Sequence, residues 1–393
     1  MFLNHRDAPP LLGHADVPAR VTESYILTGY RFPTYTLRQC LLSALRPTNE
    51  TGNFWTHFLP VFVFAYHLVE VFGWDGAPPA GDPFFYPLWN YVLGVLLLLA
   101  ASSLAHLLNS MSLVVREVCF FVDYGTISAY TVGSSLAYYY YIHPRAGVLE
   151  AGQGWAANGS STEPPPPPPP SLLASYGFPD AGALFEAFYV PSSCVVAIIC
   201  ILSCCNTRQR WRRHRYLIRT LVFLLPFLVS STPIFYRLLT RSPYPPASAS
   251  FASSASMAGY FCRHCLWLVA SAVFNISKVP ERLAPGRFDV WGHSHQWFHC
   301  CTFLSILDEF HMIKGEVRAV LLRPMLALPE EAAAAATLAA LPGPTASATY
   351  GVMLLLQATI AAIIGWFSWH AERIYGAERD QLARQGPKGH KCH

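Results

Sequence analysis

The chain has 393 residues, of which 53% are hydrophobic and only 13% are charged. Soluble domains average about 25% charged residues, so this composition argues against an ordinary soluble protein and favours one that crosses a membrane several times. The formal net charge of +4 is too small to favour a nucleic-acid partner. Most of the eleven cysteines lie in apolar runs, unlike the disulfide framework of a small secreted domain.

The first feature in chain order is a polar segment without the apolar core of a cleavable signal peptide, so we expect the first span to direct insertion. Eight apolar runs then approach the roughly 20 residues that cross a bilayer as a helix. They cover residues 54–74, 84–108, 119–141, 184–205, 217–236, 257–276, 290–312 and 349–369. We therefore expect an all-α polytopic membrane protein with a seven-helix core over 54–312 and an eighth, C-terminal transmembrane helix. The fifth and sixth runs are the weakest, because Pro226, Pro233 and Arg263 interrupt them.

The distribution of basic residues predicts the orientation of these spans. Lys and Arg concentrate in the two tails, 1–53 (with a juxtamembrane helix) and 370–393, and in the even-numbered loops, most densely at 208–219. Both tails are thus expected in the cytosol.

The two longest loops between spans are then expected on the outer side. The loop 142–183 carries a possible glycosylation site at Asn158 and a proline run, 163–170, that predicts a polyproline II spacer. The Ala-rich loop 313–348 precedes the eighth span.

Four ionisable residues gather at one expected depth. His106 ends the second span, Asp123 begins the third, and His295 and His299 begin the seventh. At about 1.5 Å per residue, all four lie within roughly 15 Å of the cytosolic surface. Ionisable side chains inside spans are functional candidates by default.

Zinc is the metal that these residue types favour, because three imidazoles and a water form an open zinc site. His295 and His299 share one helix face at i and i+4. Asp123 is then a candidate to hold the metal-bound water, and Ser102, four residues before His106, is a candidate partner of that histidine. Spacing alone leaves open the alternative that these histidines only form hydrogen bonds between helices.

Other polar residues in the spans are assigned more modest roles. His293 is expected on a different face, near the interface. His57 is a candidate fourth site residue, with helix packing or an interfacial role favoured over it. The CxxC pair of CRHC (262–265) lies near the outer side, far from the histidine layer, and is interpreted as packing. Arg263 is expected to reach either outer headgroups or a ligand.

Several motifs in order make the chain resemble the progestin and adipoQ receptor family. They are YILTGYR (25–31), TNETGNFWTH (48–57), the SxxxH of 102–106, DYGTIS (123–128) and PERLAPGRFDVWGHSHQWFH (280–299). The eighth span and PERLAPGRFD are similar to the membrane progestin receptor branch, and FNISKVPER to its epsilon type.

The resemblance implies a seven-helix core of the adiponectin-receptor type with zinc bound by His106, His295 and His299 near the cytosolic end. It also implies that Asp123 contacts the zinc-bound water. Family members are described as steroid receptors that signal through G proteins, and the adiponectin-receptor relatives show zinc-dependent ceramidase activity.

Three functions remain open at this stage. The first is a plasma-membrane receptor for a steroid, whose basic loop 206–219 contacts a heterotrimeric G protein. The second is a zinc-dependent hydrolase of a lipid amide, with Asp123 as general base. The third is a scaffold in which zinc only ties helices together.

Overall fold

The computed structural model describes residues 9–143, 181–211, 214–240, 247–326 and 343–389. These residues form ten α-helices and no β-strand. The helices are α1 (Leu37–Ser43), α2 (Thr51–Phe72), α3 (Tyr86–Leu108), α4 (Leu113–Ala137), α7 (Ala181–Gln209), α8 (Arg215–Ser230), α9 (Thr232–Thr240), α10 (Ala247–Ser277), α11 (Ser294–Leu326) and α13 (Val352–Gly389). The expected all-α fold is confirmed. The glycosylation candidate Asn158 and the proline run lie outside the described residues.

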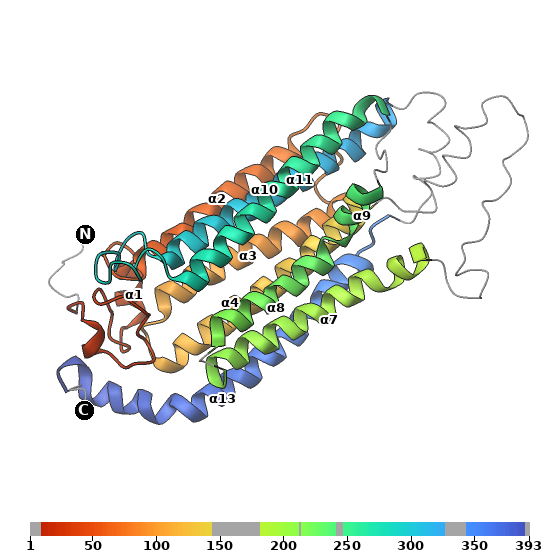
Figure 1. Cartoon of the computed structure of the whole chain (residues 1–393). Coiled ribbons are helices and arrows are strands. Elements are labelled where there is room, and N and C mark those ends of the chain that lie inside the picture. The colour runs from red at the N-terminus through yellow and green to blue at the C-terminus, as the bar shows by residue number, and fades with distance from the viewer. Residues whose placement is uncertain (1–8, 144–180, 212–213, 241–246, 327–342, 390–393) are drawn as a thin grey trace, which may run out of the picture.

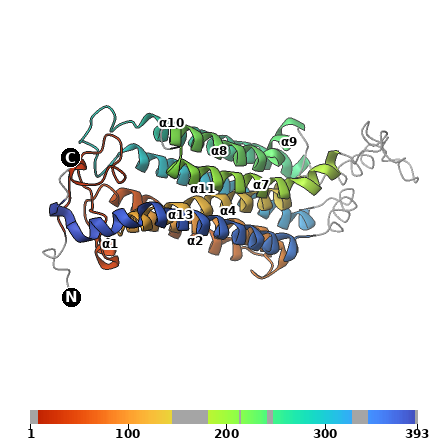
Figure 2. The ribbon, with the colours of Figure 1, turned by 90° about the horizontal axis from the view of Figure 1, so that it is seen from below.

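The long helices run side by side (Figure 1), and their contacts close them into a ring. Along the ring, α2 contacts α3, α3 contacts α4, and the series continues through α7, α8, α10 and α11, which returns to α2. Helix α13 packs outside this ring against α4 and α7. Both ends of the described chain lie at the same end of the bundle, as Figures 1 and 2 show together.

Five of the helices are individually long and apolar enough to cross a membrane: α2, α3, α7, α10 and α13, the α3 span including the preceding turn. The pair α8–α9 forms a sixth candidate, bent by 55°. Helices α4 and α11 correspond to the expected third and seventh spans but are less apolar than these helices. Both carry polar side chains that line an internal cavity, which lowers their mean hydropathy without exposing those side chains to lipid.

The two weak spans behave differently. The fifth breaks between Ser230 and Thr232, directly before Pro233, because a proline inside a helix removes a backbone hydrogen bond. The sixth is continuous through α10, because an arginine, unlike a proline, keeps its backbone hydrogen bond. Arg263 donates to both carboxylate oxygens of Asp308 on α11. Arg263 thus has a protein partner, which neither of its two expected roles had named.

Two helices extend past their expected boundaries. Helix α11 continues to Leu326 beyond residue 312, and α13 continues to Gly389 beyond residue 369. The extension of α13 presents Ala371, Tyr375 and Leu382 to the same apolar cluster as the N-terminal residues Val17 and Val21. The described parts of both tails therefore pack against the bundle.

A close crossing of α3 and α4 brings two site-bearing helices together. A Cβ at Gly133 would lie 2.9 Å from the backbone oxygen of Asn90, and one at Gly94 would lie 3.0 Å from the Cα of Tyr130. Only glycine permits this approach of two backbones.

The N-terminal segment fixes the end of α3. The buried guanidinium of Arg31 donates to the backbone oxygens of His106 and Leu107, both at 2.7 Å, and to Asn109 at 2.9 Å. These bonds satisfy carbonyl groups that a helix end otherwise leaves unpaired.

The start of α11 is fixed by a carboxylate. Glu281 accepts hydrogen bonds from the Ser294 backbone nitrogen at 2.7 Å and from the Ser294 hydroxyl. An acidic group is favourable at a helix N-terminus. The histidines near these two helix ends are thereby held in place.

Candidate metal centre

Three of the expected site residues meet at one end of the ring. His106 from α3 and His295 and His299 from α11 each offer one ligand nitrogen, and these nitrogens lie within 4.8 Å of one another. The Nε2 atoms of His106 and His295 are 3.2 Å apart. Such a group of imidazoles could hold a metal ion.

A buried carboxylate sets the orientation of His106. The Nδ1 of His106 donates to Oε2 of Glu50 at 2.7 Å, so in the neutral imidazole the Nε2 lone pair faces the other two histidines. Glu50 also accepts from the side-chain amides of Asn53 and Asn109, each at 2.7 Å. A carboxylate behind a metal-binding histidine is a common arrangement, because it fixes the tautomer and raises the basicity of the ligand.

The same reasoning applies to His299. Its Nδ1 lies 3.2 Å from the backbone oxygen of Asn53 and 3.0 Å from the hydroxyl of Thr56. Because a carbonyl oxygen only accepts, Nδ1 carries the proton and Nε2 keeps its lone pair. The Nε2 atoms of His106 and His299 therefore carry no proton, and each offers a lone pair to a metal ion.

His57 joins this group, although the sequence favoured a packing role. Its ring stacks on the ring of His299 with centroids 3.7 Å apart. Its Nδ1 shares a hydrogen bond of 2.8 Å with the Ser102 hydroxyl, and its Nε2 is buried without a partner among the described residues. The hydrogen bond of Ser102 thus goes to His57, while Glu50 occupies the position on His106 that was expected for Ser102.

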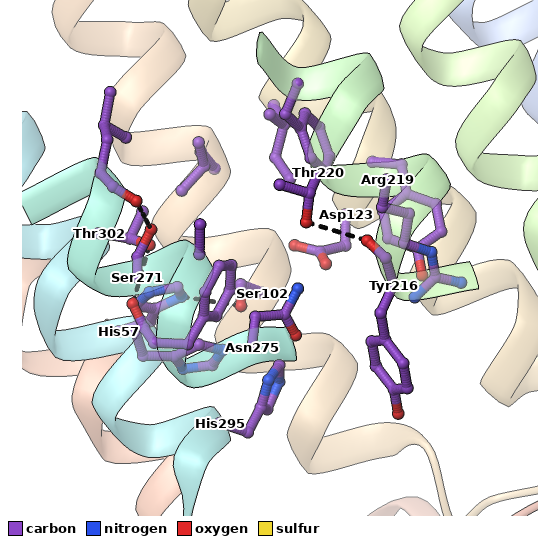
Figure 3. A pocket seen from close by; sticks show the side chains of 18 of the residues that line it. His57, Ser102, Asp123, Tyr216, Arg219, Thr220, Ser271, Asn275, His295 and Thr302 are labelled. Atoms are coloured by element: carbon purple, nitrogen blue, oxygen red, sulfur yellow. Dashed lines mark hydrogen bonds between the residues drawn. The ribbon is translucent and has the colours of Figure 1, made fainter. Parts of the chain in front are cut away.

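The histidine group opens into a cavity of about 480 Å³ inside the ring. Asp123 on α4 lines the same cavity, and Figure 3 shows its carboxylate directed into the space that the His295 ring also faces. The walls are mostly apolar, with Leu98, Phe298 and Ile306 among them. The structure therefore brings all four predicted residues to one cavity.

His293 does not join the three grouped histidines. It precedes α11 and its Nε2 lies 3.2 Å from the backbone oxygen of Asn49. It is buried in the protein, at 5% exposure, and the expected position near the membrane interface stays a prediction. Among the described residues, the cysteines of CRHC belong to no group of side chains that could hold a metal ion.

Several basic residues line the cavity, and they have partners within the protein. Arg208 donates twice to Glu117, both at 2.7 Å, and Arg219 donates to Thr207 at 2.8 Å. Lys278 lies over the ring of Tyr216, and burial lowers the pKa of its ammonium to about 8. Arg208 and Arg219, which belong to the basic run that the sequence suggested as a G-protein contact, thus form hydrogen bonds within the protein.

The carboxylate of Glu50 is the main site residue that the sequence reasoning missed. It lies in TNETGNFWTH, a motif that the sequence analysis used, and one feature of the sequence could have indicated its role. A histidine that binds metal needs a partner for its second nitrogen, and Glu50 is the acid of that motif.

Comparison with known proteins agrees with this architecture. The family described as Haemolysin-III related matches residues 45–310. The membrane progestin receptor delta of Mus musculus is 32% identical over 316 residues, covering 79% of each chain. The membrane progestin receptor gamma of Homo sapiens is 32% identical over 302 residues, covering 76% of this chain and 78% of the relative. The beta receptor of Mus musculus is 28% identical over 313 residues, covering 78% and 75%.

These relatives are of the delta, gamma and beta types, so the epsilon type stays a prediction. The helices, their ring and the extent of the match lead to one conclusion. The chain is a multi-pass membrane protein that belongs to the haemolysin-III-related family, also called the progestin and adipoQ receptor family.

Proposed function

We propose that the chain is a receptor for a steroid, with a zinc ion held by His106, His295 and His299. The observation that carries the proposal is the cavity of about 480 Å³, which is within the usual size of small-molecule sites. The relatives named as progestin receptors supply the ligand class.

Access from the membrane supports an apolar ligand. Leu221 and Leu224 of α8 and Val269 of α10 line the cavity and are also exposed on the outside of the bundle. The cavity thus reaches the outer surface between α8 and α10, where a lipid-soluble molecule could enter from the bilayer.

Zinc fits the donor set for a reason of chemistry. Neutral imidazole nitrogens are common zinc ligands, and the Nδ1 partners of His106 and His299 leave both Nε2 atoms unprotonated. The buried Nε2 of His57, which has no hydrogen-bond partner among the described residues, belongs to a ring that stacks on His299 beside this group. Metal analysis of protein purified without added zinc tests the proposal, with one equivalent expected in the wild type and a large loss in His106→Ala with His295→Ala.

Steroid binding is tested directly with purified protein in lipid nanodiscs and tritiated progesterone. Saturable binding is expected, together with a change in cyclic AMP in cells that express the chain. Binding that survives loss of the metal would favour a receptor with a structural zinc, and loss of thermal stability alone would favour a scaffold.

A second candidate is a zinc-dependent hydrolase of a lipid amide such as ceramide, favoured by Asp123 in the same cavity. A bound zinc would supply a Lewis acid for the amide carbonyl and activate a water, and the Asp123 carboxylate would accept the proton. Fatty-acid release that disappears in Asp123→Asn would support it. No release from any ceramide by zinc-loaded protein would exclude it.

We further propose that the end of the bundle holding the histidines faces the cytosol at the plasma membrane. The basic tails that meet there support this orientation. In the 206–219 region, Arg210 is exposed and is the candidate contact for a heterotrimeric G protein. Loss of steroid-dependent nucleotide exchange in Arg210→Glu, with steroid binding unchanged, is the expected result.

A further inference from the structure

A second polar group lies in the same cavity, away from the histidines. Glu309 of α11 is 2% exposed and accepts hydrogen bonds from three phenols. Tyr138 donates to Oε1 at 2.6 Å, Tyr91 donates to Oε2 at 3.2 Å, and Tyr130 donates to Oε2 as well. Glu309, Tyr130 and Tyr138 all line the cavity.

Stability alone does not account for this carboxylate. An ionisable group inside a membrane bundle is expensive, and most such groups are paired with a cation. Among the described residues, no Lys, Arg or His nitrogen lies within 4.0 Å of Glu309. The neighbouring acid Asp308, by contrast, is paired with Arg263 at 2.7 Å.

The position of Glu309 defines the length of a ligand that would reach both polar groups. It follows His299 by ten residues on the same helix, which corresponds to about 15 Å at 1.5 Å per residue. Between them the cavity wall is mostly apolar, with Ile306 from α11 and Leu98 from α3, although Thr302 of α11 also lines it. The cavity therefore has two polar ends joined by an apolar middle.

The hydroxyl hydrogens around Glu309 already form hydrogen bonds within the protein. We call Glu309 with Tyr91, Tyr130 and Tyr138 the Glu309 group. Each phenol has one hydrogen, and Tyr130 and Tyr138 direct theirs to the carboxylate. The nearby cavity-lining hydroxyl of Ser134 donates to the backbone oxygen of Tyr130. What remains toward the cavity is lone pairs on carboxylate and phenol oxygens, and these can only accept.

We propose that the Glu309 group binds a hydroxyl of the ligand and discriminates against a carbonyl at that position. This rests on the proposed receptor function and narrows its ligand class. The ligand is an elongated apolar lipid with a hydroxyl at the Glu309 end and a second oxygen at the histidine end. A carbonyl at Glu309 would place an acceptor against acceptors, which leaves buried groups unpaired and is strongly rejected.

The experiment uses the zinc-loaded full chain in nanodiscs and two pregnane steroids that differ only at carbon 3, one with a hydroxyl and one with a ketone. Each competes with a tritiated pregnane steroid that carries a hydroxyl at carbon 3. We expect the hydroxysteroid to bind about 10-fold tighter, because the ketone leaves buried polar groups mispaired. In Glu309→Gln, whose amide adds donors, this preference should fall by about 10-fold.

Two further variants separate recognition from a structural role. Asp308→Asn changes the adjacent acid, which pairs with Arg263, and should leave the preference unchanged. Tyr138→Phe frees a lone pair of the carboxylate, so it should keep or raise the preference for the hydroxysteroid. If Glu309→Gln does not fold, this variant tests whether the carboxylate recognises the hydroxyl.

Each outcome has a distinct meaning. Binding of both steroids with equal affinity, or an unchanged preference in Glu309→Gln, overturns this inference and leaves the receptor proposal standing. A Tyr138→Phe variant that loses the preference as Glu309→Gln does points to a structural role and also overturns it. No saturable binding of any steroid overturns the receptor proposal, and the inference with it.

Discussion

Glu50→Gln is expected to weaken zinc binding without emptying the site. The carboxylate accepts from His106 Nδ1, Asn53 and Asn109, all at 2.7 Å. A glutamine amide has only one acceptor oxygen. Its NH₂ group would therefore lie against at least one of these three donors, and that donor would lose its hydrogen bond. His106 then loses the acceptor that fixes its tautomer.

Substitution of groups behind metal ligands costs about 10–100-fold in metal affinity, or roughly 1.4–2.8 kcal/mol. The assay is competition with a zinc chelator on detergent-purified protein, with zinc content measured by mass spectrometry. Glu70→Gln is the matched control, because Glu70 lies on α2, which Glu50 directly precedes, but is partly exposed and paired with Lys314 at 2.6 Å. Wild-type zinc affinity in Glu50→Gln would refute the proposed role of the carboxylate.

Two other changes test the packing and a basic residue that lines the cavity. Gly133→Ala should destabilise the bundle by about 1–3 kcal/mol, because its Cβ would meet the Asn90 backbone oxygen. Gly365→Ala is the control, since its Cβ would meet nothing within 4 Å. Equal melting temperatures of the two variants would contradict the close crossing. Burial lowers the pKa of Lys278 from 10.5 to about 8, so its charged form disfavours folding below pH 8 and this penalty disappears as the pH rises to about 10.5. Lys278→Met should therefore raise the melting temperature more at pH 7.5 than at pH 10, and a difference independent of pH would argue against the shift.

The positions of helices followed from patterns along the chain. The apolar runs predicted each long helix, and the i, i+4 spacing of His295 and His299 placed both on one face. The shared depth of His106 and Asp123 also followed, because residue number converts to depth along a helix. Helix ends were less predictable, since α13 is prolonged by contacts of Tyr375 with the N-terminal segment.

The sequence by itself determined the class of protein, the number of long helices and the layer in which the histidines lie. Only the tertiary structure decided which side chains complete that layer: Glu50 behind His106, His57 against His299, and the carboxylate of Glu309 among tyrosines from α3 and α4. The physical reason is that periodicity fixes the face and depth of a residue on its own helix. Which helices become neighbours, and which hydrogen-bond partner a side chain then reaches, depends on the packing of the ring as a whole.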